Sequence, residues 1–141
     1  MRVMGLDVGD RRIGVALSDA LGLTAQRLTV LTRQHASVDA KMIGALANQH
    51  GVETIVVGLP LTMRGEQGTQ AKRVASFVET LRRSTAVPIQ WIDERLTTVQ
   101  GERALLETGA SRRKRKQVID QVAAQLILQQ FLDVQAHSRR D

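Results

Sequence analysis

The chain begins with Met1-Arg-Val-Met-Gly-Leu-Asp-Val8, followed by Gly9-Asp10 and then by Arg12-Ile-Gly-Val-Ala-Leu-Ser18. Two short apolar runs separated by glycine and aspartate are typical of a β-hairpin, because these two residue types readily form a tight turn. A third run, from Thr24 to Leu31, predicts another strand. We therefore expect three hairpin-linked strands at the start of the fold.

Strands and helices are expected to alternate along the rest of the chain. The expected helices are Ala36 to Gln49, Gly68 to Ser84, Thr97 to Thr108 and Lys116 to Val134, and the expected strands are Glu53 to Val57 and Val87 to Ile92. Hydrophobic residues at helical spacing indicate the helices, and short β-branched runs indicate the strands. This order predicts an α/β fold with a mixed five-stranded sheet, three antiparallel strands and then parallel strands, flanked by helices. It matches the ribonuclease H-like architecture, although other α/β folds also fit.

Length and charge indicate one domain and a polyanionic partner. The chain has 141 residues, so we expect a single domain over residues 1–135 and a disordered tail over residues 136–141. With 20 Lys and Arg against 14 Asp and Glu, the formal net charge is +6, which favours nucleic acid. Aromatic residues make up only 2% of the chain, which argues against a protein that binds single strands by stacking.

Missing features of the sequence exclude several other classes of protein. There is no cysteine, which excludes disulfides, thiol catalysis and cysteine zinc sites. No stretch approaches the roughly 20 apolar residues that a membrane-spanning helix needs. The first residues lead directly into a strand, without the apolar segment of a signal peptide. We therefore expect a cytoplasmic protein with no membrane partner.

Three acidic residues occupy positions at which a carboxylate needs an explanation. Asp7 lies inside an apolar strand, where an unpaired carboxylate costs several kcal/mol. Glu94 directly follows a buried strand, which is where an α/β sheet usually places its functional groups. Asp120 lies in a helix beside Ala123 and Ala124, two small residues that allow the helix backbone to approach a neighbouring element closely.

Each acid also has an ordinary structural explanation. Asp7 could lie at the edge of the sheet or pair with a cation, and Asp120 could pair with a lysine four residues earlier. Asp93 could pair with Arg95, and the spacing does not decide whether Asp93 or Glu94 faces a site. The three positions belong to the first strand, the end of a central strand and the last helix, so the fold is able to bring them together.

Taken together, the acids predict a metal site that cleaves phosphodiester bonds. Carboxylate oxygens are hard ligands that suit Mg²⁺ or Mn²⁺. Two such ions, about 4 Å apart, can activate a water and stabilise the leaving oxygen. We therefore predict a metal-dependent endonuclease in which Asp7, Glu94 and Asp120 are the catalytic residues and the metal ligands.

Basic residues near these acids are candidates for binding nucleic acid. The cluster that leads into the last helix consists of Arg112, Arg113, Lys114, Arg115 and Lys116. It could hold backbone phosphates, or it could be a solvated linker. Arg11 and Arg12 lie at the expected hairpin tip, and Arg95 directly follows Glu94. The loop from Leu61 to Gly68, which contains Arg64, could close over a substrate or be a plain connection.

Several segments resemble the YqgF family, whose members are described as Holliday-junction-resolvase-like proteins and as pre-16S ribosomal RNA nucleases. The matching segments are Gly5-Leu-Asp-Val-Gly9, Arg12-Ile-Gly-Val-Ala16, Ser18-Asp19, Val56-Val-Gly-Leu-Pro60, Met63 with Gly65, Asp93-Glu-Arg-Leu-Thr-Thr98, and Asp120 with Ala123-Ala124 and Ile127-Leu-Gln129. They cover roughly residues 2–134 in the family's order, which makes the resemblance specific.

The resemblance implies a ribonuclease H-like fold and a metal-dependent endonuclease that matures the 5′ end of small-subunit ribosomal RNA. Resolution of Holliday junctions in DNA is the alternative activity that it implies. By position, Asp7, Glu94 and Asp120 fall on the family's acidic residues. Ribonuclease H-type sites often hold a fourth acid, and no residue is indicated for it here, which leaves the number of metals open. A junction resolvase needs two sites and hence a homodimer, whereas an RNA-processing enzyme can be a monomer.

Two other functions fit parts of the sequence. Asp7-Val-Gly9 before a hairpin also resembles the first phosphate loop of actin-type and sugar-kinase domains. Those enzymes close two such domains around ATP, and this chain has the length of only one. The second alternative is a non-catalytic module that has the same fold and binds nucleic acid through its basic residues.

Overall fold

Five strands form one mixed sheet in the order β3-β2-β1-β4-β5. The computed structural model describes residues 1–97 and 112–140, and the side chains of residues 1–97 and 122–138. The strands are β1 (Arg2–Val8), β2 (Arg12–Ser18), β3 (Ala25–Thr32), β4 (Val52–Leu59) and β5 (Ile89–Asp93). The helices are α1 (Ala36–Gln49), α2 (Thr69–Ser84), α4 (Arg112–Arg140) and the short 3₁₀ helix η1 (Glu94–Leu96).

The pairing of the strands confirms the predicted sheet. Strands β1, β2 and β3 are antiparallel neighbours, and β4 and β5 continue the sheet parallel to β1. The first hairpin closes where glycine predicted it, because the Gly9 N–H donates a 2.9 Å hydrogen bond to the carbonyl oxygen of Arg12. Because β1, β4 and β5 are parallel, their carboxyl ends lie at one edge of the sheet.

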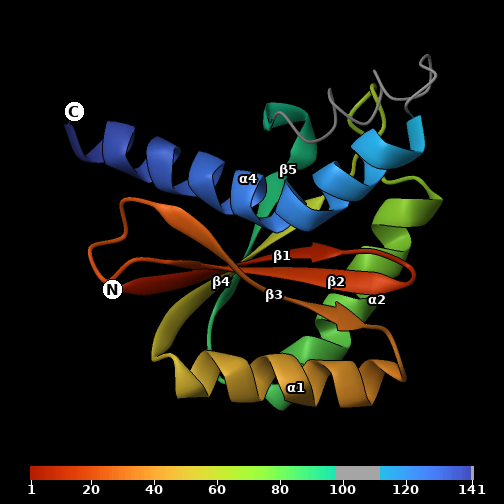
Figure 1. Ribbon diagram of the computed structural model, residues 1–141, viewed down its shortest axis with the longest axis horizontal. Helices are drawn as coiled ribbons and strands as arrows, with labels where there is room; N and C mark the ends of the chain where they lie inside the picture. Colours follow the sequence, from red (N-terminus) through yellow and green to blue (C-terminus); the bar gives the residue numbers. More distant parts are fainter. Residues whose placement is uncertain (98–111, 141) are drawn as a thin grey trace.

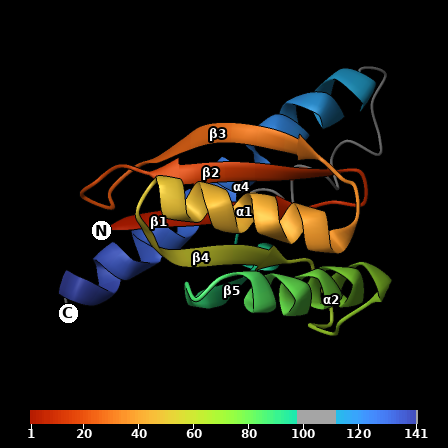
Figure 2. The same cartoon turned by 90° about the horizontal axis from the view of Figure 1, so that it is seen from below.

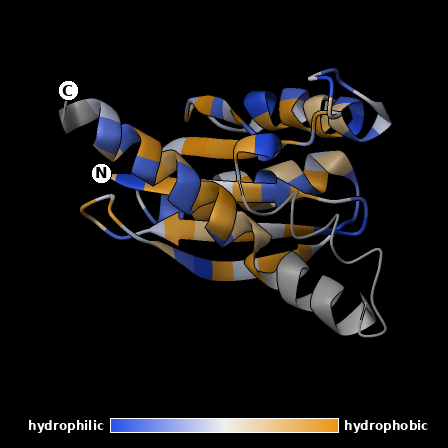
Figure 3. Cartoon of the chain, turned by 90° about the horizontal axis from the view of Figure 1, so that it is seen from above, coloured by the Kyte–Doolittle hydropathy of each residue, from blue (hydrophilic) through white to orange (hydrophobic). Residues whose placement is uncertain are grey.

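Helices cover both faces of the sheet and enclose two apolar layers. Helices α1 and α2 lie on one face and α4 crosses the other (Figures 1 and 2). Leu6 and Val57 belong to the layer beneath α1 and α2, whereas Val3 and Val56 belong to the layer beneath α4. The alternation follows from the two-residue period of a strand. Figure 3 shows the hydrophobic stretches of the strands beneath α4.

Helix α4 is held against the sheet by two glutamines and by a close backbone approach. Gln125 donates to the Ala25 carbonyl at 3.0 Å, and Gln129 accepts a 2.9 Å hydrogen bond from the Ala25 N–H. On β1, an added Cβ at Gly5 would lie 2.7 Å from the Cβ of Leu128 and 3.0 Å from the carbonyl oxygen of Ala124. The helix therefore rests directly on the backbone of β1.

Helix α4 differs from the predicted helix at both ends. It starts at Arg112, so the basic run is part of the helix and not a linker before it. Arginine and lysine are good helix formers, and neither glycine nor proline interrupts them. The helix also continues to Arg140, through most of the expected tail, whereas the helix predicted for Thr97 to Thr108 lies almost wholly outside the described residues. Neither α4 nor any other helix in the described ranges is long and apolar enough to span a membrane.

Replacement of Gly5 by alanine tests the close approach of α4. The added methyl group meets helix backbone at 3.0 Å, so the helix must shift. We expect Gly5→Ala to lower the free energy of unfolding by about 1–3 kcal/mol, the usual cost of overpacking a core. Urea denaturation followed by circular dichroism measures this change.

The matched control is Gly68→Ala, at the N-cap of α2. Here the new methyl group meets only the Thr62 Cγ2 atom, at 3.3 Å, and the backbone has an ordinary φ of −80°. We expect a loss of less than about 1 kcal/mol, as for other glycine caps. Equal losses in the two variants would contradict the inferred contact between α4 and β1.

Candidate active site

The carboxyl ends of β1, β4 and β5 bring two of the predicted acids to one edge of the sheet. Asp7 is the second-last residue of β1, and Glu94 is the first residue after β5. The register pairs Leu6 with Val57 and Gly58 with Ile92, so the three strands end side by side. Functional groups of α/β sheets are usually found at this edge.

Asp7 lies on the face of the sheet that α4 covers. Its neighbours Leu6 and Val8 pack on the opposite face, and Gly5, two residues earlier, touches α4. The side chain of Asp7 is partly buried, and on β2 it lies opposite Gly14, which has no side chain of its own. Asp7 is therefore a partly buried acid near the end of a core strand.

Glu94 lies on the same face, over the neighbouring strand. It is only 2% exposed. An added Cβ at Gly58 of β4 would lie 3.0 Å from the Glu94 Cγ atom, 3.1 Å from its Oε1 atom and 2.7 Å from the Ile127 Cδ1 atom of α4. The absence of a side chain at Gly58 thus makes room for the Glu94 carboxylate between β4 and α4. Since β4 is the direct neighbour of β1, Asp7 and Glu94 lie on the same face of neighbouring strands.

Asp93 has a different role from that of its neighbour. Its carboxylate makes a salt bridge with Arg95 at 2.7 Å and also accepts hydrogen bonds from the Arg95 Nε and backbone N–H groups. The hydrogen bond from the Arg95 side chain holds the pKa of Asp93 below its usual value, and the same contact raises the pKa of Arg95. Asp93 therefore caps η1 and binds Arg95, whereas Glu94 is directed toward α4.

The third predicted acid and the basic cluster lie outside the described side chains. The backbone of α4 includes Asp120 and residues 112–116. Among the side chains that the structure describes, no three acids or histidines form a group able to hold a metal. Asp7 and Glu94 supply two of the oxygen-donating side chains that Mg²⁺ and Mn²⁺ prefer, and a third ligand would have to come from elsewhere.

The other predicted cations lie at the same edge of the sheet, in or next to its loops. Arg11 and Arg12 are exposed where the first hairpin turns, directly after β1. Arg64 is exposed in the loop after β4. Arg95 is the exception, because its guanidinium group is already engaged by Asp93. This edge thus combines two acids with cations that are accessible to a phosphate backbone.

Sequence reasoning missed the group that fixes the hairpin tip. The Nε of Arg33 contacts Asp39 at 2.9 Å, its Nη1 donates to the Gly9 carbonyl at 2.9 Å, and its Cζ lies 4.8 Å from the centre of the Phe77 ring. Asp39 is 1% exposed and lies one turn before the buried Ile43 on α1. An acid on the buried face of a helix needs a cationic partner. The four-residue spacing between Asp39 and Ile43 is the feature of the sequence that could have indicated this buried acid.

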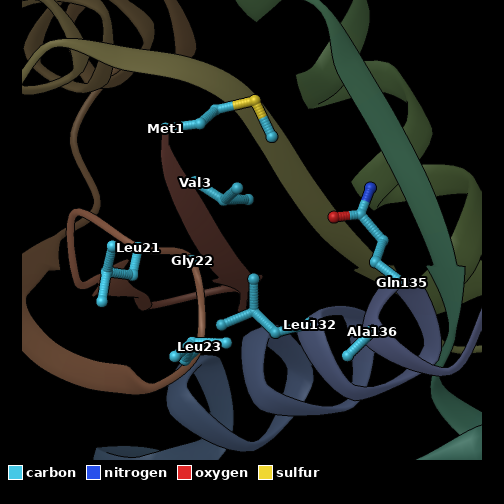
Figure 4. A pocket seen from close by; sticks show the side chains of 8 residues that line it. All are labelled: Met1, Val3, Leu21, Gly22, Leu23, Leu132, Gln135 and Ala136. Carbon is cyan, nitrogen blue, oxygen red and sulfur yellow. The ribbon is translucent and has the colours of Figure 1, made fainter. Parts of the chain in front are cut away.

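A small pocket at the opposite end of the sheet has a different character (Figure 4). It is lined by Met1, Val3, Leu21, Gly22, Leu23, Leu132, Gln135 and Ala136, none of which has an acidic or basic side chain. It also shows the direction of α4. The helix meets the start of β1 near Leu132 and meets Gly5 near Ala124 and Leu128, so it runs antiparallel to that strand.

Comparison with solved structures confirms the predicted ribonuclease H-like fold. The chain superposes on Thermus thermophilus RuvC bound to a Holliday junction substrate with a TM-score of 0.57 and 18% sequence identity, covering 92% of this chain and 91% of that one. A second structure of Thermus thermophilus RuvC also gives a TM-score of 0.57, at 15% identity. RuvC is a nuclease of the ribonuclease H-like class, so the likeness establishes this fold for the chain.

Sequence comparison identifies the family. A protein from Moorella thermoacetica named "Putative pre-16S rRNA nuclease" is 53% identical over 94% of this chain and 95% of its own length. A protein of the same name from Halothermothrix orenii is 49% identical over 96% of both chains. The model of the family described as "RuvX: Holliday junction resolvase" matches residues 1–134. The chain therefore belongs to the RuvX family of Holliday junction resolvase-like nucleases.

Proposed function

We propose that this nuclease uses Mg²⁺ or Mn²⁺, held by Asp7, Glu94 and Asp120, to cleave structured RNA, and that its substrate is the cytoplasmic precursor of 16S ribosomal RNA. The position of Asp7 and Glu94 on one face of neighbouring strands supports the proposal most directly. The names of its relatives support the choice of RNA as the substrate. The excess of positive charge fits a polyanion.

The direction of α4 is the argument for Asp120 as the third acid. Along β1 from Val3 to Gly5, the helix residues opposite the strand change from Leu132 to Leu128 and Ala124. Two residues further along β1 is Asp7, and one helical turn before Ala124 is position 120. If one helical turn of α4 continues to correspond to two residues of β1, position 120 lies near the end of β1, where Asp7 is.

The residues of the chain have distinct tasks in this reaction. Asp7 and Glu94 present carboxylate oxygens from a rigid sheet, which fixes their positions before the substrate arrives. Arg11 and Arg12 can neutralise phosphates next to the cleaved bond. Bound Mg²⁺ or Mn²⁺ would supply an activated water and stabilise the leaving oxygen. The Asp93 carboxylate is already bound by Arg95, which supports Glu94 and not Asp93 as the ligand.

Removal of either described acid should abolish cleavage. We expect Asp7→Asn and Glu94→Gln each to reduce kcat more than about 100-fold, since even groups that only orient a metal ligand contribute roughly 10- to 100-fold. RNA binding and thermal stability should persist. The measurement is gel analysis of a labelled 16S precursor with and without Mg²⁺, and with a four-way DNA junction in parallel.

The control is an acid that lies away from the proposed ligands. Glu53 is exposed near the start of β4, at the opposite end of that strand. We expect Glu53→Gln to cleave like the unsubstituted protein. Unchanged cleavage by Asp7→Asn would leave only a non-catalytic role in nucleic-acid binding. Faster cleavage of the DNA junction than of the RNA would favour junction resolution, which the family description and the RuvC-like fold also support.

The distinct roles of Asp93 and Glu94 predict distinct pH effects. Arg95 lowers the pKa of Asp93, so the ionised pair stabilises the fold above the unfolded-state pKa of about 3.9. This stabilisation is lost as the pH falls below that value and through the lower pKa of the folded state. We expect Asp93→Asn to lower the Tm at pH 7 and to make no difference in the most acidic buffers, while retaining cleavage at pH 7. Thermal unfolding between pH 7 and pH 3 tests this, and loss of cleavage as severe as in Glu94→Gln would contradict it.

The basic start of α4 is expected to bind phosphates. Changing residues 112–116 to glutamine keeps good helix formers and removes five charges. We expect weaker RNA binding, and the slope of log K against log salt should become shallower by up to about 4 units. Fluorescence anisotropy at several salt concentrations measures this slope.

The control for this cluster is Arg82→Gln with Arg83→Gln at the end of α2. These residues lie in the last turn of a helix that returns to the opposite edge of the sheet. The slope should then be unaltered. An unaltered slope in the variant of residues 112–116 would show that this cluster does not contact the substrate.

A further inference from the structure

Two large apolar side chains project from loops at the edge that carries the acids. Met63, in the loop between β4 and α2, is 86% exposed, and Leu96, the last residue of η1, is 63% exposed. Both follow strands whose carboxyl ends form the proposed active site. Leaving such side chains in water forgoes roughly 1.5–3 kcal/mol of burial each, and this edge is otherwise rich in arginine. Both side chains are therefore accessible to a ligand with an apolar surface.

The loop that carries Met63 has a defined conformation. The Gly65 N–H donates to the Thr62 carbonyl at 2.8 Å, and the Thr62 N–H donates to the Glu66 carbonyl at 2.9 Å. The Thr62 hydroxyl accepts a further hydrogen bond from the Glu66 N–H at 3.1 Å. Gly65 has a φ of +82°, which a residue with a side chain rarely adopts. Met63 is thus held at the tip of a tight turn.

Arg95 connects this turn to the neighbourhood of Glu94. An added Cβ at Gly65 would lie 3.2 Å from both Nη atoms of Arg95. The same guanidinium group is anchored by Asp93, the residue before Glu94. The turn therefore rests on a planar cation that is bound by the residue before the buried acid, so the turn that carries Met63 lies close to η1.

The faces of nucleic-acid bases are the apolar surface that this edge can meet. A thioether is polarisable and packs favourably on aromatic rings, and methionine is among the side chains that proteins insert beside unstacked bases. The two phenylalanines are not available for this task, because Phe77 is 3% exposed and Phe131 is 9% exposed. An uncharged side chain gains nothing from phosphates, so Met63 is suited to a base and not to the backbone.

We propose that Met63 packs against an unstacked base at the junction of paired and unpaired RNA, with Leu96 as a second apolar contact, and so holds that junction at the acids. This inference rests on the proposed nuclease function and adds a specificity determinant to it. It explains how a protein poor in aromatic residues recognises a structured substrate, because the contact made by Met63 needs an exposed base and not a particular sequence.

The test uses an RNA hairpin with a single-stranded 5′ extension and 2-aminopurine at the junction nucleotide. All proteins carry Asp7→Asn, so that the RNA is bound in Mg²⁺ without being cut. The parent protein should raise the fluorescence of the junction label and leave a label in the middle of the duplex unchanged. Adding Met63→Ser should remove most of this rise and weaken binding about tenfold, the equivalent of losing one buried apolar contact.

Two further variants separate a base contact from general damage. Met63→Leu keeps an apolar side chain and should preserve the fluorescence rise. Met42→Ser removes a methionine that is 40% exposed on α1, on the face of the sheet opposite α4, and should match the parent. Equal fluorescence and affinity for the Met63→Ser variant and its parent would overturn the inference.

Cleavage of the same RNA by protein with Asp7 intact distinguishes failure of the base contact from failure of the proposed nuclease function. Normal cleavage together with an unaltered Met63→Ser variant would refute the base contact alone. If the protein neither bound nor cleaved the RNA, the proposed function would fail, and the base contact would fail with it.

Discussion

Direct contact between helix α4 and the bare backbone of two strands is the constraint on which the rest of the structure depends. Gly5 lets the helix rest on β1, and Gly58 leaves the space that the Glu94 carboxylate occupies beneath Ile127. A Cβ at either glycine would collide at 2.7 Å. Core packing and site geometry are therefore set by the same two positions. The helix cannot move away from the sheet without also altering the surroundings of Glu94.

The fold was predictable where local chemistry decides it. Glycine and aspartate at positions 9 and 10 predicted the first hairpin, and the run Ile55-Val56-Val57 predicted a strand buried on both faces, as β4 is. The start of α4 was not predictable in the same way. Its first turns consist of charged residues without an apolar stripe, which resemble a linker in sequence although arginine and lysine have high helix propensity.

The candidate site was predictable as a set of unusual positions but not as a geometry. Asp7 could be recognised because a carboxylate inside an apolar strand is costly. The choice between Asp93 and Glu94 could not be made, because adjacent residues share one sequence context and only the folded chain shows that Arg95 binds one of them. The contact of Arg33 with Gly9 was equally inaccessible, since it joins residues 24 positions apart.

Ion pairs are concentrated where the proposed site needs rigid loops. Among the described residues, Arg33 bound to Asp39 fixes the hairpin after β1, and Arg73 links the same hairpin to α2 through Asp10. The pair formed by Arg95 and Asp93 supports both the turn after β4 and the start of η1. The pairs at Asp10 and Asp93 are exposed and contribute little to global stability, so their value here is positional. They hold three loops in place around two carboxylates, whereas the opposite end of the sheet carries an apolar pocket without acidic or basic side chains.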